Sequence, residues 1–160
     1  MSIHPAYGSV VAAARPAVIL LVEDDPADQE LTRRALAEGR IANELIIVDD
    51  GEQAVDYLLR QGRFADPATS PRPDLVLLDL NLPRLDGRQV LQRLREDPRV
   101  AKLPVVVLTT SKQEQDILHS YALAANSYIV KPVDVNQFMQ VIRSLEEYWF
   151  AIVVLPPEEP

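Results

Sequence analysis

The sequence contains no cysteine and only two histidines, His4 and His119, among its 160 residues. Without cysteine the chain can form no disulfide bond, has no thiol nucleophile and cannot hold zinc through thiolates. Two histidines are also too few for a metal site built from several imidazoles. The absence of cysteine is compatible with a reducing compartment, and we expect a cytoplasmic protein.

Long apolar runs and an excess of positive charge are also missing. The longest apolar stretches, residues 17–22 and 148–155, fall far short of the roughly 18 residues of a membrane-spanning helix. Residues 10–14 lack the basic start and the long apolar core of a signal peptide. The formal net charge is −8 and the isoelectric point is near 4.7. Binding to phosphate backbones needs patches of lysine and arginine, so we expect neither nucleic-acid nor membrane binding.

Five short strand-forming segments are present, at residues 18–22, 45–48, 75–78, 104–108 and 127–130. The first four are apolar without alternation, which is typical of strands buried on both faces of a parallel sheet. Helical patterns begin near residues 26, 51, 86, 111 and 134. This alternation of strands and helices predicts an α/β fold with a doubly wound, five-stranded parallel sheet.

The first helix shows the local signals clearly. An Asp-Pro pair opens it as N-cap and first helical position, and Asp28 lies in the first turn, where an acidic side chain is favourable. The helix is predicted to turn Leu31, Ala35 and Leu36 inward and to end at Gly39.

The length of the chain suits one domain with its own core. We expect residues 1–16 to form a flexible leader and residues 17–149 to form the domain. Residues 150–160 form an apolar tail. Side chains as apolar as Phe150 and Ile152 are unfavourable in solvent, so the tail is expected to pack on the domain or to contact a second copy.

Asp79 is the first candidate for a functional residue. It directly follows the apolar run Leu75–Leu78, and Pro83 prevents the strand from continuing. A carboxylate after a fully apolar strand is costly unless it reaches solvent, a cation or hydrogen-bond donors. In open α/β sheets, ligands bind at the carboxyl ends of the strands. A simple turn acid is the structural alternative.

Polar side chains also follow the other strands. Glu23 and Asp24 come after the first, Thr109 ends the fourth and Lys131 follows the fifth. Neighbouring carboxylates repel each other unless a cation compensates, and oxygen ligands without cysteine or histidine indicate Mg²⁺, or Mn²⁺ in its place. Lys131 adds a positive charge and Thr109 a hydroxyl donor. Because aspartate is a covalent phosphoryl acceptor, the set predicts a cradle for a phosphoryl group on Asp79.

Several segments together resemble the receiver domain of bacterial two-component response regulators. They are residues 21–25 (Leu-Val-Glu-Asp-Asp), 77–83 (Leu-Leu-Asp-Leu-Asn-Leu-Pro), 86–87 (Asp-Gly), 108–109 (Leu-Thr) and 128–132 (Tyr-Ile-Val-Lys-Pro). The resemblance runs in order from about Ala17 to Leu145. It implies the flavodoxin-like receiver fold, with strand order 2-1-3-4-5.

The resemblance also implies roles for these residues. Asp79 would accept a phosphoryl group from the phosphohistidine of a sensor kinase, Lys131 would contact that group, and Thr109 and Tyr128 would form a switch pair. For Tyr128, packing in the strand is an equally simple explanation. Apart from this self-catalysed phosphoryl transfer and dephosphorylation, no enzymatic turnover is expected.

A metal site is implied in the same way. Asp24, Asp79 and the main-chain carbonyl of Asn81 would bind Mg²⁺, and Glu23 would help, often through water. Glu23 stands where aspartate is frequent in receivers, which leaves a direct contact between its carboxylate and the metal open.

A narrower resemblance concerns the loop at residues 61–73, the Leu-Thr-Thr-Ser segment at 108–111 and the ending at 148–155. These are similar to the single-domain regulators that partner bacterial and cyanobacterial phytochromes. The resemblance implies a phytochrome-type sensor histidine kinase as partner and signalling by protein–protein contact without an output domain. We expect a homodimer through the fourth helix, fifth strand, fifth helix and tail.

Three other functions compete with this interpretation. A pseudo-receiver would bind partners without being phosphorylated. A phosphohydrolase of the haloacid dehalogenase type would share the acidic cluster, but it usually carries a second acid where this chain has Asn81. A nucleotide-binding module needs a glycine-rich turn after the first strand, where this chain has Glu-Asp-Asp-Pro.

Overall fold

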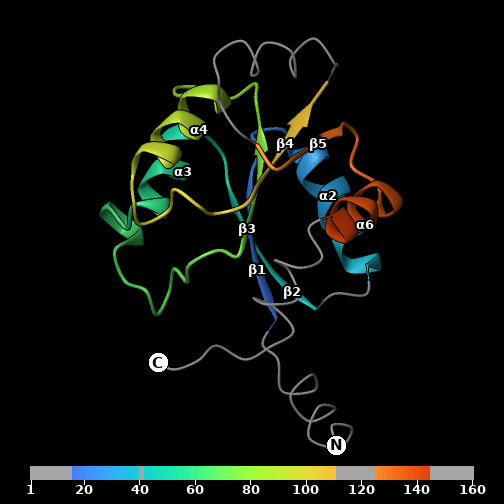
Figure 1. Ribbon diagram of the computed structural model, residues 1–160, viewed down its shortest axis with the longest axis horizontal. Coiled ribbons are helices and arrows are strands. Elements are labelled where there is room, and N and C mark those ends of the chain that lie inside the picture. The colour runs from blue at the N-terminus through green and yellow to red at the C-terminus, as the bar shows by residue number, and fades with distance from the viewer. Residues whose placement is uncertain (1–15, 40–41, 111–124, 145–160) are drawn as a thin grey trace, which may run out of the picture.

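The computed structural model describes residues 16–39, 42–110 and 125–144. Five parallel strands form one sheet in the order β2-β1-β3-β4-β5 (Figure 1). The strands are β1 Ala17–Val22, β2 Asn43–Val48, β3 Leu75–Asp79, β4 Val105–Thr109 and β5 Ser127–Val130. The predicted fold class and strand order are both confirmed.

Helices cover both faces of the sheet. The helices α3 (Gly51–Leu58) and α4 (Gly87–Glu96) pack together on one face, and α2 (Pro26–Glu38) and α6 (Val135–Ser144) pack together on the other (Figure 1). The loop predicted at residues 61–73 contains one short 3-10 helix, Gly62–Phe64. The predicted helix from residue 111, the leader and the tail lie outside the described residues. Within those residues no helix is long and apolar enough to cross a membrane.

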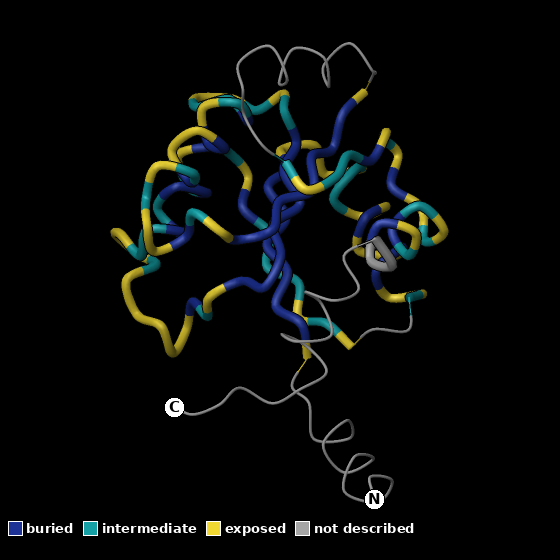
Figure 2. The backbone as a smooth tube through the Cα atoms, in the orientation of Figure 1, coloured by how far each residue is buried: buried dark blue, intermediate teal, exposed yellow. Residues whose placement is uncertain are grey.

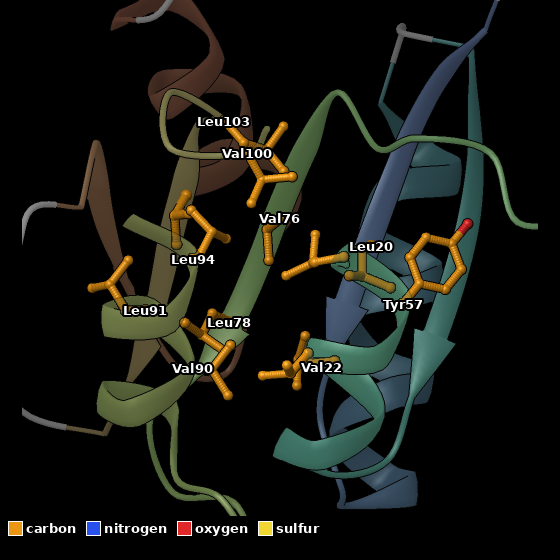
Figure 3. Packing of buried hydrophobic residues seen from close by; sticks show 14 of the residues in the cluster. Leu20, Val22, Tyr57, Val76, Leu78, Val90, Leu91, Leu94, Val100 and Leu103 are labelled. Atoms are coloured by element: carbon orange, nitrogen blue, oxygen red, sulfur yellow. The ribbon is translucent and has the colours of Figure 1, made fainter. Parts of the chain in front are cut away.

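The two-sided cover explains why the strands are apolar throughout. Every residue of β1, β3 and β4 is buried, and in Figure 2 the buried sheet is enclosed by helices whose outer surfaces are exposed. Alternate residues of a strand point to opposite faces. Leu20 and Val76 therefore join the cluster under α3 and α4, which Figure 3 shows, whereas Ile19 and Leu75 join the cluster under α2 and α6.

The helix starts follow the predicted signals. The side chain of Asp25 accepts a hydrogen bond from the Ala27 N–H at the start of α2. At α4, Asp86 and Gln89 form a complete capping box. Both helices therefore begin with caps made by residues within one turn of the helix start, as the sequence predicts.

One inward residue of α2 was predicted wrongly. Leu31 is 43% exposed, whereas Thr32, Ala35 and Leu36 are buried. Thr32 lies three and four residues before the two other buried positions and therefore shares their face, while Leu31 lies at its margin. The position on the helix outweighs the greater hydrophobicity of leucine.

Candidate functional site

The register of the sheet brings the predicted site residues to one edge. Val22 pairs with Leu78, so Glu23 and Asp79 follow side by side at the ends of β1 and β3. In β4, Thr109 pairs with Val130, which places Lys131 one residue beyond. The Lys131 N–H donates to the Thr109 carbonyl oxygen at 2.9 Å. Side chains from four separate segments therefore meet at the carboxyl ends of the strands.

Three carboxylates form a tight group at this edge. Glu23, Asp24 and Asp79 each place one carboxylate oxygen within 4.8 Å of the others. Glu23 and Asp79 are buried, whereas Asp24 is exposed. The Asn81 N–H donates to Asp79 Oδ1 at 3.1 Å and so holds the start of the following loop beside the acid. Like charges at this spacing favour a bound cation.

Lys131 is the counter-charge of the cluster. Its Nζ lies 2.8 Å from Asp28 Oδ2, 3.0 Å from Glu23 Oε1 and 3.2 Å from Asp79 Oδ2. Burial alone would lower the pKa of the ammonium, but the carboxylates of Asp28, Glu23 and Asp79 at close range outweigh it and raise the pKa. Lys131 therefore remains a cation at neutral pH.

The sequence assigned Asp28 only to the first turn of its helix and missed its contact with Lys131. A first-turn acid is explained by the helix alone, and nothing in the spacing of the chain connects it to Lys131. The contact exists because α2 and the segment after β5 lie on the same side of the sheet (Figure 1).

Glu23 has the least satisfied carboxylate of the group. Oε2 accepts the Asp25 N–H at 3.1 Å. Oε1 is buried, and within the described part of the chain its contact is the 3.0 Å ion pair with Lys131 Nζ, which lacks the geometry of a well-formed hydrogen bond. Burial, followed by the charge of Asp79, raises the pKa of Glu23 to about 7 against the lowering effects of the Asp25 N–H and Lys131. A buried oxygen with incomplete partners fits a divalent cation.

The two predicted switch residues lie on the same face of the sheet. Thr109 is buried at the end of β4, and Tyr128 pairs with Val107 two residues earlier on that strand. Tyr128 is partly buried against the cluster under α3 and α4, and this burial raises the pKa of its hydroxyl. Side chains two residues apart along a strand share a face, so Tyr128 is diagonal to Thr109.

Gly87 holds the loop after Asp79 in close contact with α4. Its N–H donates to the Leu80 carbonyl oxygen at 3.0 Å. A Cβ atom at Gly87 would lie 2.6 Å from Leu80 Cα and would overlap the Asp79 carbonyl oxygen. The absence of a side chain therefore allows the backbone of Asp79 to sit directly against the start of the helix.

Residues 19–143 match the family described as the response regulator receiver domain. The chain belongs to this family. The receiver is 44% identical over 141 residues to the response regulator Rcp1 of Synechocystis sp.. The aligned region covers 88% of this chain and 94% of Rcp1. The structure of Rcp1 in its Mn²⁺-bound form superposes with a TM-score of 0.68 and covers 88% of this chain and 99% of that one.

Two further solved structures are similar to the receiver. The bacteriophytochrome response regulator RtBRR is 44% identical, with a TM-score of 0.78 and coverage of 90% of this chain and 86% of that one. The phosphorylated cyanobacterial phytochrome response regulator RcpA is 44% identical, with a TM-score of 0.70 and coverage of 89% and 99%.

These findings confirm both predicted resemblances, to receivers in general and to phytochrome-associated regulators in particular. As a family member, the receiver is a signalling protein of phosphorylation-based two-component systems. The nucleotide-binding and phosphohydrolase alternatives are thereby superseded. The individual roles of the site residues stay predictions.

Proposed function

We propose that Asp79 accepts a phosphoryl group from the phosphohistidine of a sensor histidine kinase. The observation that carries the proposal is the contact between Asp79 Oδ2 and the Lys131 ammonium at 3.2 Å, directly beside the acidic group. A carboxylate oxygen of Asp79 forms the new O–P bond while the N–P bond of the donor breaks. The released imidazole keeps the electron pair of that bond.

Asp24, Asp79 and the main-chain carbonyl of Asn81 are proposed to hold Mg²⁺, with Mn²⁺ as a substitute. Glu23 assists with its buried Oε1, directly or through water. Bound Mg²⁺ would offset the negative charge of the carboxylates and of the phosphoryl oxygens. The oxygen-only donor set supports this assignment, and so does the Mn²⁺ bound by the similar Rcp1.

Lys131 is proposed to neutralise the phosphoryl oxygens, and the Thr109 hydroxyl to donate a hydrogen bond to them. When Thr109 moves toward the phosphoryl group, it vacates space on the face that it shares with Tyr128, and the ring turns inward. This couples Asp79 to the surface formed by the segment after β4, β5 and α6. The same residues, together with the bound cation, would also support self-catalysed hydrolysis of the aspartyl phosphate by water.

The proposed partner is a phytochrome-type sensor histidine kinase in the cytoplasm. The similarity to RtBRR and RcpA, both named as phytochrome response regulators, supports it. We also propose a homodimer through the segment after β4, β5, α6 and residues 150–160. Val130 of β5 is 47% exposed and lies on this surface.

Acetyl phosphate with saturating Mg²⁺ tests the proposal, read by intact mass and light scattering. We expect the mass gain of one phosphoryl group, and a simultaneous change in molecular weight would identify dimerisation as the output. No mass gain would contradict phosphorylation and favour the pseudo-receiver, which binds partners without being phosphorylated.

Mg²⁺ is expected to stabilise the folded receiver because it relieves repulsion among three clustered carboxylates. At a concentration about 100 times its Kd, a ligand of the native state adds about 2.7 kcal/mol to the free energy of unfolding. Urea denaturation with Mg²⁺ and with EDTA measures the increment. Asp24→Asn should reduce it strongly, whereas Asp56→Asn on α3 should leave it intact. Equal increments in both variants would place the cation elsewhere.

A further inference from the structure

The Lys131 ammonium is shared by more carboxylates than the proposed phosphoryl chemistry requires. Of its three acidic contacts, the shortest is the 2.8 Å contact with Asp28 Oδ2. The ammonium thus has three carboxylate neighbours, as many as it has N–H groups, and the contact with Asp79 Oδ2 is also a hydrogen bond. Among the described residues, the carboxylates close enough to share a cation are those of Glu23, Asp24 and Asp79, and Asp28 is not one of them.

A phosphoryl group on Asp79 brings new acceptor oxygens to an ammonium that three carboxylates already surround. One carboxylate must then give up its share of Lys131. The Glu23 side chain is 1% exposed and that of Asp79 is 3% exposed, whereas that of Asp28 is 25% exposed. Asp28 also lies in the first turn of α2, where water and the helix N-terminus can stabilise a released carboxylate.

The contact between Asp28 and Lys131 disfavours the phosphoryl group, but it favours binding of the divalent cation. Lys131 and a divalent cation compete for the oxygens of Glu23 and Asp79. When Asp28 draws the ammonium toward α2, those oxygens interact less strongly with Lys131. The carboxylate of Asp28 therefore favours the cation-bound, unphosphorylated site and opposes the phosphorylated one.

We propose that Asp28 is a positioning residue that competes with the phosphoryl group for Lys131 and sets the balance between the two states. This inference rests on the proposed role of Asp79. Asp28 acts through Lys131 and contacts neither the cation nor the transferred group.

Asp28→Asn keeps the shape of the side chain and removes its charge. Calorimetric titration with beryllofluoride at saturating Mg²⁺ should give a Kd lowered about two- to fivefold, within the range of one partly exposed ion pair. Titration with Mg²⁺ alone should give a Kd raised by a similar factor. Asp28→Ser, which also suits a helix start, should change both constants in the same directions if the asparagine variant folds poorly.

Two controls separate this effect from charge in general. Glu30→Gln removes one negative charge from the same helix, at a residue that pairs with Arg33 and Arg34, and should change neither constant. In a Lys131→Gln background, Asp28→Asn should no longer raise the Kd for Mg²⁺, because the shared ammonium is gone.

An unchanged or raised Kd for beryllofluoride in the Asp28 variants would overturn the inference, and so would an effect on Mg²⁺ that persists without Lys131. Failure of the unmodified receiver to bind beryllofluoride would instead contradict the proposed function. The two failures are thus distinguishable.

Discussion

Asp79→Asn is expected to abolish phosphorylation by acetyl phosphate. The amide is nearly the same size as the carboxylate, and its oxygen can still accept the Asn81 N–H that now reaches Asp79 Oδ1. It is, however, a far weaker nucleophile, so the mass gain of one phosphoryl group should disappear while the fold is retained. Intact mass after incubation with acetyl phosphate and Mg²⁺ measures the loss directly.

The matched control is Asp56→Asn, which makes the same chemical change in the second half of α3, outside the group of carboxylates that could share a cation. It should acquire the phosphoryl group like the unmodified receiver. A mass gain retained in Asp79→Asn would refute the assignment of the acceptor, and the cluster of Glu23, Asp24 and Lys131 would then need a different explanation.

Gly87→Ala is expected to destabilise the receiver and to disturb its site together. The added Cβ would overlap the Asp79 carbonyl oxygen and lie 2.6 Å from Leu80 Cα, and backbone atoms cannot move aside as the end of a long side chain can. Overpacking of this kind costs about 1–3 kcal/mol. Urea denaturation should show a lower free energy of unfolding, and phosphorylation by acetyl phosphate should slow because the loop after β3 is displaced.

Gly39→Ala provides the matched control. The nearest atom to a Cβ at Gly39 is the Leu36 carbonyl oxygen at 3.5 Å, and the backbone φ of −71° is one that alanine adopts readily. Its free energy of unfolding should be unchanged or raised by about 0.4–1 kcal/mol, because alanine restricts the unfolded chain. Equal stability of the two variants would mean that the loop after Asp79 has room that its close backbone contacts do not indicate.

Local patterns predicted most of the fold. The apolar runs that became β1, β3 and β4 have no polar alternation, since both sides of the sheet are covered, and this signal is independent of distant parts of the chain. The Asp-Pro pair before α2 and the Asp86–Gln89 capping box likewise act within one turn of helix. The strand order came from the resemblance to receivers, because no local signal specifies which strands become neighbours.

The functional site likewise combines features that local sequence predicted with features that only the folded chain could provide. The prediction that Asp79 is functional followed from its place directly after a buried strand, where a turn acid alone is a poor explanation. That Glu23, Asp24, Thr109 and Lys131 would accompany it followed from the rule that parallel strands end at one edge. Distances, burial and the raised pKa of Glu23 required the folded chain, because they depend on side chains at the ends of β1, β3 and β5 together.

The amino-acid sequence by itself determined the buried strands, the helix starts and the acidic edge, because each depends on residues near one another in the chain. Only the tertiary structure decided that Asp28 joins Lys131, that Leu31 faces solvent and that Gly87 must lack a side chain. Each of these depends on where α2, α4 and the segment after β5 come to lie relative to the sheet. That placement is set by packing over the whole core, which no short stretch of sequence encodes.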